Sequence, residues 1–114
     1  MPYDAIVTAA HRTQYPKPIS FKAGEKVRVG KRDDEYPGWI WTTVASGDSA
    51  WAPEELLTVS GTEAVALVDY ESTELNTEAG ESVRVLFEML EWAWVKNSSG
   101  KEGWVPLKTL QPRS

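Results

Sequence analysis

The 114-residue sequence contains no cysteine and one histidine, His11. Without cysteine, disulfides, thiolate zinc sites and thiol nucleophiles are excluded, and one histidine excludes sites built on histidine pairs. No run of about 18 apolar residues occurs, so we expect no membrane-spanning helix. The start, Met1-Pro2-Tyr3-Asp4, lacks a basic region followed by an apolar run, so we expect no signal peptide. These absences predict a soluble, cytoplasmic, non-redox protein.

Positive charge is also scarce. The chain has 12 Lys and Arg against 17 Asp and Glu, for a net charge of −5. Nucleic-acid affinity depends largely on clustered basic side chains, so this charge opposes a nucleic-acid partner, although the aromatic content alone would allow base stacking. No carboxylate is paired in the sequence with a His, Cys or Lys in a recognisable nucleophile arrangement. We therefore expect no enzyme activity, no catalytic residues, no metal and no cofactor.

Six tryptophans reveal an internal repeat. Trp39, Trp41 and Trp51 recur 53 residues later as Trp92, Trp94 and Trp104, and Pro53 recurs as Pro106. Upstream, Gly24-Glu25 and the alternating segment after it recur at an offset of 56, as Gly80-Glu81. Ala5-Ile6-Val7 is matched with Ala66-Leu67-Val68 at an offset of 61. A shared order of this kind indicates a duplication.

Two domains are therefore predicted, at residues 1–59 and 63–114. The segment between them, around Ser60-Gly61-Thr62, is small and polar and is interpreted as a short linker. Within each repeat, apolar and charged residues alternate as in half-buried strands, for example over residues 83–87. Turn-forming residues at 46–49 and 97–100 indicate hairpins. The pattern predicts an all-β fold with five short strands per repeat.

The motifs of the second repeat resemble those of SH3 domains. Ala66-Leu67-Val68-Asp69-Tyr70 is similar to the ALYDY signature, and Gly80-Glu81, Trp92 and Gly103-Trp104-Val105-Pro106 follow in the family's order. The first repeat resembles the family through Gly24-Glu25, Trp39 and Trp51-Ala52-Pro53, with a divergent opening strand. The resemblance implies two small five-stranded SH3-like barrels in tandem, joined by a short linker.

The resemblance also implies a function. SH3 domains bind proline-rich peptides in the polyproline II conformation on a shallow aromatic groove. Five groove positions carry over to the second repeat as Val68, Tyr70, Trp92, Pro106 and Thr109, and to the first as Val7, Ala9, Trp39, Pro53 and Leu56. Tyrosines are missing at two positions of the second repeat, and the first repeat retains none. We expect peptide binding mainly in the second domain.

The predicted binding residues follow from this placement. In the second domain they are Tyr70, Trp92, Trp104 and Pro106, with the acidic residues Glu71 and Glu74; in the first domain they are Trp39, Trp51 and Pro53. An acidic rim beside aromatic rings suits a basic or proline-rich peptide or protein through long-range attraction. His11 is interpreted as an ordinary loop residue.

The alternative is a structural or assembly protein. Strand alternation places Trp41 and Trp94 on the same face as Trp39 and Trp92. Such tryptophan-rich faces also suit contact between the two domains or homo-oligomerisation, with neither groove used. The sequence leaves these two functions open.

Overall fold

The computed structural model describes residues 2–13 and 17–113, and in this part of the chain the fold is all-β. Its regular elements are antiparallel strands and two single 3₁₀ turns. Among these residues no helix has the length and apolarity needed to cross a bilayer. The predicted fold class is therefore confirmed at the level of all-β structure.

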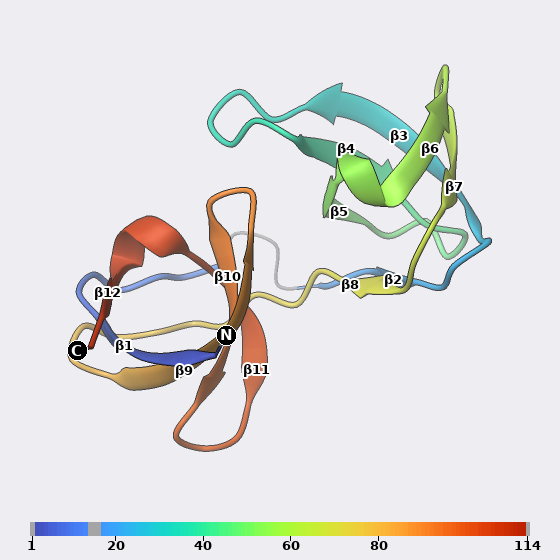
Figure 1. The fold of residues 1–114 in the computed structure, drawn as a ribbon. Helices are drawn as coiled ribbons and strands as arrows, with labels where there is room; N and C mark the ends of the chain where they lie inside the picture. Colours follow the sequence, from blue (N-terminus) through green and yellow to red (C-terminus); the bar gives the residue numbers. More distant parts are fainter. Residues whose placement is uncertain (1, 14–16, 114) are drawn as a thin grey trace. The chain divides into compact units, whose positions relative to one another are not determined.

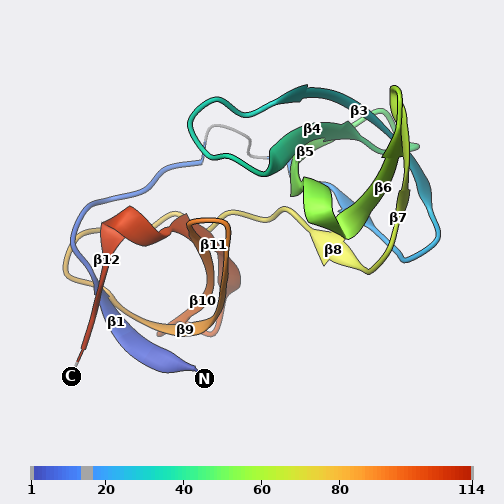
Figure 2. The same ribbon diagram turned by 45° about the horizontal axis from the view of Figure 1, so that its top comes forward.

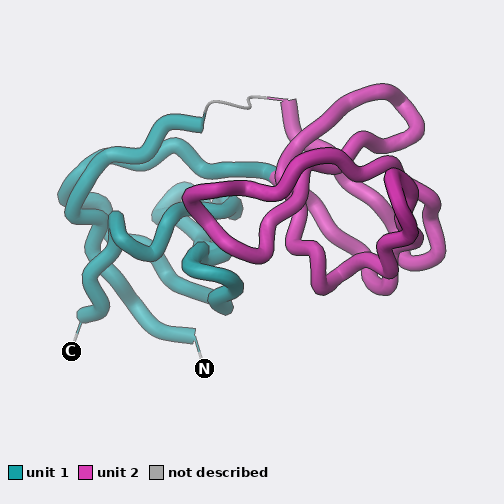
Figure 3. Tube along the Cα trace, turned by 90° about the horizontal axis from the view of Figure 1, so that it is seen from above, with its two compact units in different colours: residues 1–16, 73–114 teal, residues 17–72 magenta. Residues whose placement is uncertain are grey.

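The chain forms two compact units, and their bounds differ from the predicted domains. Unit 1 consists of residues 1–16 together with 73–114, and unit 2 consists of residues 17–72 (Figure 3). The first repeat thus contributes its opening segment to the unit built mainly from the second repeat. In return, residues 63–72 of the second repeat belong to the unit built from the first.

Unit 1 contains one five-stranded antiparallel sheet. Its strands are β1 (Tyr3–Val7), β9 (Ser82–Met89), β10 (Trp92–Asn97), β11 (Glu102–Pro106) and β12 (Leu110–Pro112), with the 3₁₀ turn η2 (Leu107–Thr109) before β12. The order is β11-β10-β9-β1-β12, so β1 lies between β9 and β12 (Figures 1 and 2). One core of small and β-branched side chains forms beneath it, including Ala5, Val7, Val85, Val95 and Val105.

Unit 2 repeats this order with different strands. Its elements are β2 (Ser20–Phe21), β3 (Lys26–Arg32), β4 (Trp39–Thr43), β5 (Ser49–Pro53), η1 (Glu54–Leu56), β6 (Leu57–Ser60), β7 (Glu63–Ala66) and β8 (Tyr70–Glu71). The main sheet has the order β5-β4-β3-β7-β6, and β2 and β8 form a separate two-stranded sheet. The separate core includes Phe21, Val27, Ile40 and Leu57.

Strands β1 and β7 occupy equivalent places in the two units. Ala5 pairs with Val83, and Ala64 pairs with Val27, the residue that matches Val83 in the repeat. The offset between the opening strands is therefore 59, and the predicted offset of 61 is wrong. Because strand side chains alternate with a period of two, a shift of two residues leaves the apolar pattern unchanged.

A tight turn explains why the opening strands are exchanged. Ser60 pairs directly with Glu63, so Gly61-Thr62, interpreted above as part of a linker, is the loop of the β6–β7 hairpin. Gly61 has a φ of +64°, which glycine adopts without the steric cost of a side chain. The hairpin holds β7 beside β6, and β1 fills the equivalent place beside β9 and β12.

Surface charges favour the same exchange. In unit 1 Arg12 pairs with Glu78, whereas in unit 2 Lys22, which matches Glu78 in the repeat, pairs with Asp69. Returning each opening segment to its own repeat would place Arg12 beside Lys22 and Asp69 beside Glu78. Each exposed pair contributes at most about 1 kcal/mol, but both pairs favour the same arrangement.

Candidate functional site

The exchange separates the predicted binding residues. Unit 1 holds Glu74, Trp92, Trp104 and Pro106, and unit 2 holds Tyr70 and Glu71 together with Trp39, Trp51 and Pro53. The structure therefore does not bring Tyr70 and Glu71 into the same unit as Trp92. The physical reason is the β6–β7 hairpin, which carries the residues after β7 into unit 2.

In unit 1 the position equivalent to Tyr70 is taken by His11. Tyr70 pairs with Phe21, and His11 forms the equivalent bridge with Thr77. The His11 ring lies edge-on to Trp92, with 5.5 Å between ring centroids and an interplanar angle of 81°. The interpretation of His11 as an ordinary loop residue did not foresee this contact with the Trp92 ring. The sequence could have indicated this contact of His11 if the opening strands had been aligned at an offset of 59, which matches His11 with Tyr70.

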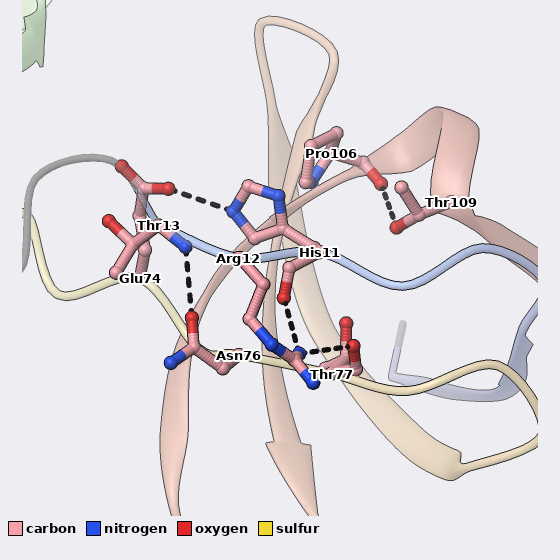
Figure 4. Close-up of polar contacts among 8 residues, drawn as sticks. All are labelled: His11, Arg12, Thr13, Glu74, Asn76, Thr77, Pro106 and Thr109. Atoms are coloured by element: carbon pink, nitrogen blue, oxygen red, sulfur yellow. Dashed lines mark hydrogen bonds and ion pairs between the residues drawn. The ribbon is translucent and has the colours of Figure 1, made fainter.

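A carboxylate completes this site. His11 Nε2 lies 2.8 Å from Glu74 Oε1, and the two side chains are 15% and 16% exposed (Figure 4). Partial burial strengthens such a hydrogen bond because little water competes for it. The arrangement holds an imidazole ring, an indole ring and a carboxylate at one place on the surface of unit 1.

Two chain segments far apart in the sequence position His11. Its N–H donates to the Thr77 carbonyl at 3.0 Å, and the Thr77 N–H donates back to the His11 carbonyl at 2.9 Å. Next to this bridge, Arg12 Nη1 donates to the Thr77 carbonyl at 2.8 Å, and the Thr13 N–H donates to Asn76 Oδ1 at 2.9 Å (Figure 4). These hydrogen bonds hold the His11 backbone against residues 76–77.

The ring that His11 contacts, Trp92, comes from the main sheet of unit 1. Trp92 begins β10 and is the cross-strand partner of Pro106, which ends β11. Trp92 is half-buried and Pro106 is buried. Thr109, one of the groove positions implied by the resemblance, is also buried, and its hydroxyl donates to the Pro106 carbonyl at 2.7 Å. Trp92 therefore supplies the accessible ring, and Pro106 and Thr109 support it.

Trp104, also predicted to bind ligand, is only 4% exposed. It packs edge-on against Trp94 at 5.4 Å and against Phe87 at 5.5 Å. Its backbone N–H donates to the carbonyl of Thr73 at 2.8 Å, and its carbonyl accepts from the Leu75 N–H at 3.1 Å, which fixes the 73–75 segment along the edge of β11. Its role in the structure is packing.

The predicted site in unit 2 is more deeply buried. Trp39 is 4% exposed, and Pro53 is fully buried. The Tyr70 hydroxyl donates to the Trp51 carbonyl at 2.9 Å, and its ring packs against Phe21 at 5.3 Å. These contacts join two of the predicted residues, Tyr70 and Trp51, which are both half-buried, whereas Trp39 and Pro53 are buried.

The exchange also redistributes charge. Unit 2 has six basic and ten acidic residues, for a net charge of −4, and unit 1 has six and seven, for a net charge of −1. Among the described residues, no group of three or more His, Asp or Glu side chains is placed to hold a metal ion. Unit 1 is thus the less acidic of the two units.

Comparisons with known proteins add no assignment. Neither protein-family models, nor curated protein sequences, nor solved structures match this chain.

Proposed function

We propose that the chain is a non-catalytic protein–protein interaction module made of two five-stranded SH3-like barrels. The main binding site lies in unit 1, between His11, Glu74 and Trp92. The ligand is a peptide or an extended protein segment that places apolar or proline residues against the rings and a basic residue near the carboxylate.

The strand arrangement supports the barrel part of this proposal. Both units have the same order of five antiparallel strands, with a 3₁₀ turn before the strand that flanks the opening strand. Five short twisted strands in this order are typical of a small barrel, and closing into a barrel leaves few exposed strand edges. Trp39 and Pro53 are cross-strand partners in unit 2, as Trp92 and Pro106 are in unit 1, so these motif residues fall at equivalent places.

The observation that carries the binding proposal is the contact between His11 and Trp92. Two flat rings at 81° to each other, one half-buried and the other fixed by Glu74, form an apolar corner with a charged edge. A polyproline II segment is already extended, so docking it against such rings costs little chain entropy. No group in this corner has to react for it to bind.

The test is a titration with proline-rich peptides, with and without a flanking arginine, followed by the six indole N–H signals in NMR spectra. We expect a saturable shift of the Trp92 signal, weakened by His11→Ala. The matched variant is Tyr70→Ala, which changes the equivalent position of unit 2 and should leave the Trp92 shift unchanged. Unperturbed signals from the other indoles show that each variant is folded.

Two results would contradict the proposal. If none of the six indole signals shifts with any peptide, the proposed site in unit 1 is rejected. A response lost in Tyr70→Ala but kept in His11→Ala would place the binding site in unit 2.

A second function, assembly through apolar faces, is favoured by one observation. Val65, Leu67 and Val68 lie together along and just after β7 and are 40%, 55% and 44% exposed. Neighbouring exposed aliphatic side chains are typical of surfaces that associate. Sedimentation equilibrium tests this function: a monomer at all concentrations rejects it, and an oligomer that Leu67→Ser dissociates supports it.

A further inference from the structure

A second group of aromatic rings lies in unit 1, on the face of the sheet that also carries Trp92. Trp94, on strand β10 between β9 and β11, is the cross-strand partner of Phe87 on β9 and of Trp104 on β11. The Phe87 and Trp94 rings are nearly parallel, at 17°, with centroids 6.4 Å apart. Phe87 is 48% exposed, whereas Trp104 is buried edge-on to both rings. Phe87 and Trp94 therefore present ring surface, and Trp104 supports them.

A carboxylate is held beside these rings. The Trp94 indole N–H donates to Glu102 Oε1 at 2.8 Å, and Glu102 itself is exposed. Glu102 precedes Trp104 by two residues in β11, so both side chains lie on the same face of the sheet. A carboxylate with one oxygen bound in this way can still accept hydrogen bonds from a ligand. Two basic residues lie in the same cross-strand row as Glu102: Lys96, its partner on β10, and Arg84, the partner of Lys96 on β9.

Unit 2 contains the same pair of tryptophans with different charges around them. Trp41 and Trp51 meet edge-on at 5.1 Å and 73°, much as Trp94 and Trp104 meet at 5.4 Å and 74°. The residue that matches Phe87 in the repeat is Lys31, and its Nζ lies 5.9 Å from the centre of the Trp51 ring. The residue that matches Glu102 is Ser49. Unit 2 thus supplies a cation to its own rings and lacks the carboxylate.

From this contrast we propose that the surface formed by Phe87, Trp94 and Glu102 binds an arginine side chain of a partner protein. A guanidinium group is planar, stacks on aromatic rings and donates hydrogen bonds to a carboxylate. The surface offers nearly parallel rings and a carboxylate fixed beside them. In unit 2 the cation beside the rings is Lys31 of the chain itself; in unit 1 the arginine of the partner would occupy the equivalent position.

This inference deepens the proposed function, since it rests on a peptide or protein being the ligand, but it concerns different residues on the face of the sheet that also carries Trp92. The proposed groove uses Trp92 and His11, whereas the arginine site uses Trp94 and Glu102. The two can therefore be tested with different peptides and different indole signals.

The experiment titrates the full chain with short proline-free peptides that differ in a single residue: arginine, lysine or citrulline. Citrulline keeps the planar shape of arginine and removes the charge. We expect the arginine peptide to give a saturable shift of the Trp94 indole signal, the lysine peptide a weaker one and the citrulline peptide none. The arginine response should weaken as salt is added, because part of the attraction is between exposed charges.

Three variants locate the site. Phe87→Lys copies unit 2 by supplying an internal cation, and we expect it to abolish the arginine response. Glu102→Gln keeps the hydrogen bond from Trp94 and removes the charge, so affinity should fall about fivefold, the size expected for one exposed charge interaction. Lys31→Gln, the matched change in unit 2, should leave the Trp94 response unchanged.

A Trp94 response that is equal for arginine and citrulline, or unchanged in Glu102→Gln, overturns the inference. If proline-rich peptides shift Trp92 while arginine peptides shift no signal, the proposed function stands and the arginine site is rejected. If only the arginine peptides respond, through Trp94, the arginine site stands and the groove is rejected.

Discussion

Ser60 and Glu63 are cross-strand partners separated by only two residues, and this pairing decides which opening strand belongs to which unit. All four residues of β6 pair with the four residues of β7 across the loop Gly61-Thr62, which keeps β7 beside β6. Strand β7 therefore completes unit 2, and β1, at the start of the chain, completes unit 1. The same pairing puts Tyr70 in unit 2, and in unit 1 His11 lies beside Trp92.

The exchange predicts which engineered disulfide forms. Ile6 on β1 is the Cα partner of Ser82 on β9, and antiparallel Cα partners lie within the range a disulfide can bridge. The double variant Ile6→Cys, Ser82→Cys should oxidise to a monomeric disulfide that mass spectrometry detects. Because the chain has no cysteine of its own, no other bridge competes.

The matched control is Ile6→Cys, Lys26→Cys. Lys26 pairs with Val65, the residue of β7 that corresponds to Ile6, so these cysteines meet only if β1 stands beside β3. We expect no intramolecular bridge in this variant. Its formation, with failure of the first bridge, would mean that each repeat keeps its own opening strand.

Gly103 should tolerate no side chain. A Cβ at this position would lie 2.9 Å from the Leu75 backbone nitrogen and 3.1 Å from the carbonyl carbon of Glu74, and backbone cannot move aside cheaply. We expect Gly103→Ala to lower the free energy of unfolding by about 2 kcal/mol, as overpacking commonly does. Chemical denaturation measures this change.

Gly30, also in a strand, provides the comparison. A Cβ there meets only the Trp41 side chain and backbone, at 3.8 Å or more, which is ordinary contact. We expect Gly30→Ala to change stability by less than about 1 kcal/mol, and replacing glycine within a strand can even stabilise it. Equal losses in both variants would show that close approach of the 73–75 segment is not what requires Gly103.

Replacing His11 by tyrosine should strengthen binding of proline-rich peptides. Tyr70 occupies the equivalent position in unit 2, so the backbone geometry accepts a tyrosine there. A larger ring would add apolar area beside Trp92, and about 40 Å² of extra burial corresponds to roughly 1 kcal/mol, or fivefold in affinity. Titration of the Trp92 indole signal measures the change. Weaker binding in His11→Tyr than in the unaltered chain would show that the imidazole itself is required.

Tyr3 should ionise unusually late. Burial, and then a hydrogen bond to Glu88 and the charge of that carboxylate, raise the pKa of Tyr3 to about 12 from an ordinary value of 10. Because the folded chain keeps this proton when the unfolded chain has lost it, the contribution of Tyr3 to stability falls as pH rises from about 10 to 12. The phenolate absorbance lost in Tyr3→Phe identifies the transition.

Glu88→Gln is the companion variant for this titration. Removing the carboxylate charge should move the pKa of Tyr3 down toward 10, with the part due to burial remaining. A Tyr3 transition that is unaltered in Glu88→Gln would mean that burial alone raises the pKa.

Local patterns in the sequence determine much of this protein. Alternation of apolar and charged residues, turn-forming segments and the 53-residue recurrence of the tryptophans predict all-β structure and the duplication, because strand periodicity and turn chemistry act over a few residues. The contacts of Trp92 with Pro106 and of Trp94 with Trp104 follow from hairpins that the same patterns predict.

Only the tertiary structure decided how the opening strands are shared. Both registers of β1 put apolar side chains on the same face, and β1 and β7 are similar enough for either to fit either sheet. The choice depends on a two-residue turn and on charges, Arg12 with Glu78 and Lys22 with Asp69, that lie far apart in the sequence. Long-range pairing of this kind leaves no local pattern, and it is what places His11, rather than Tyr70, beside Trp92.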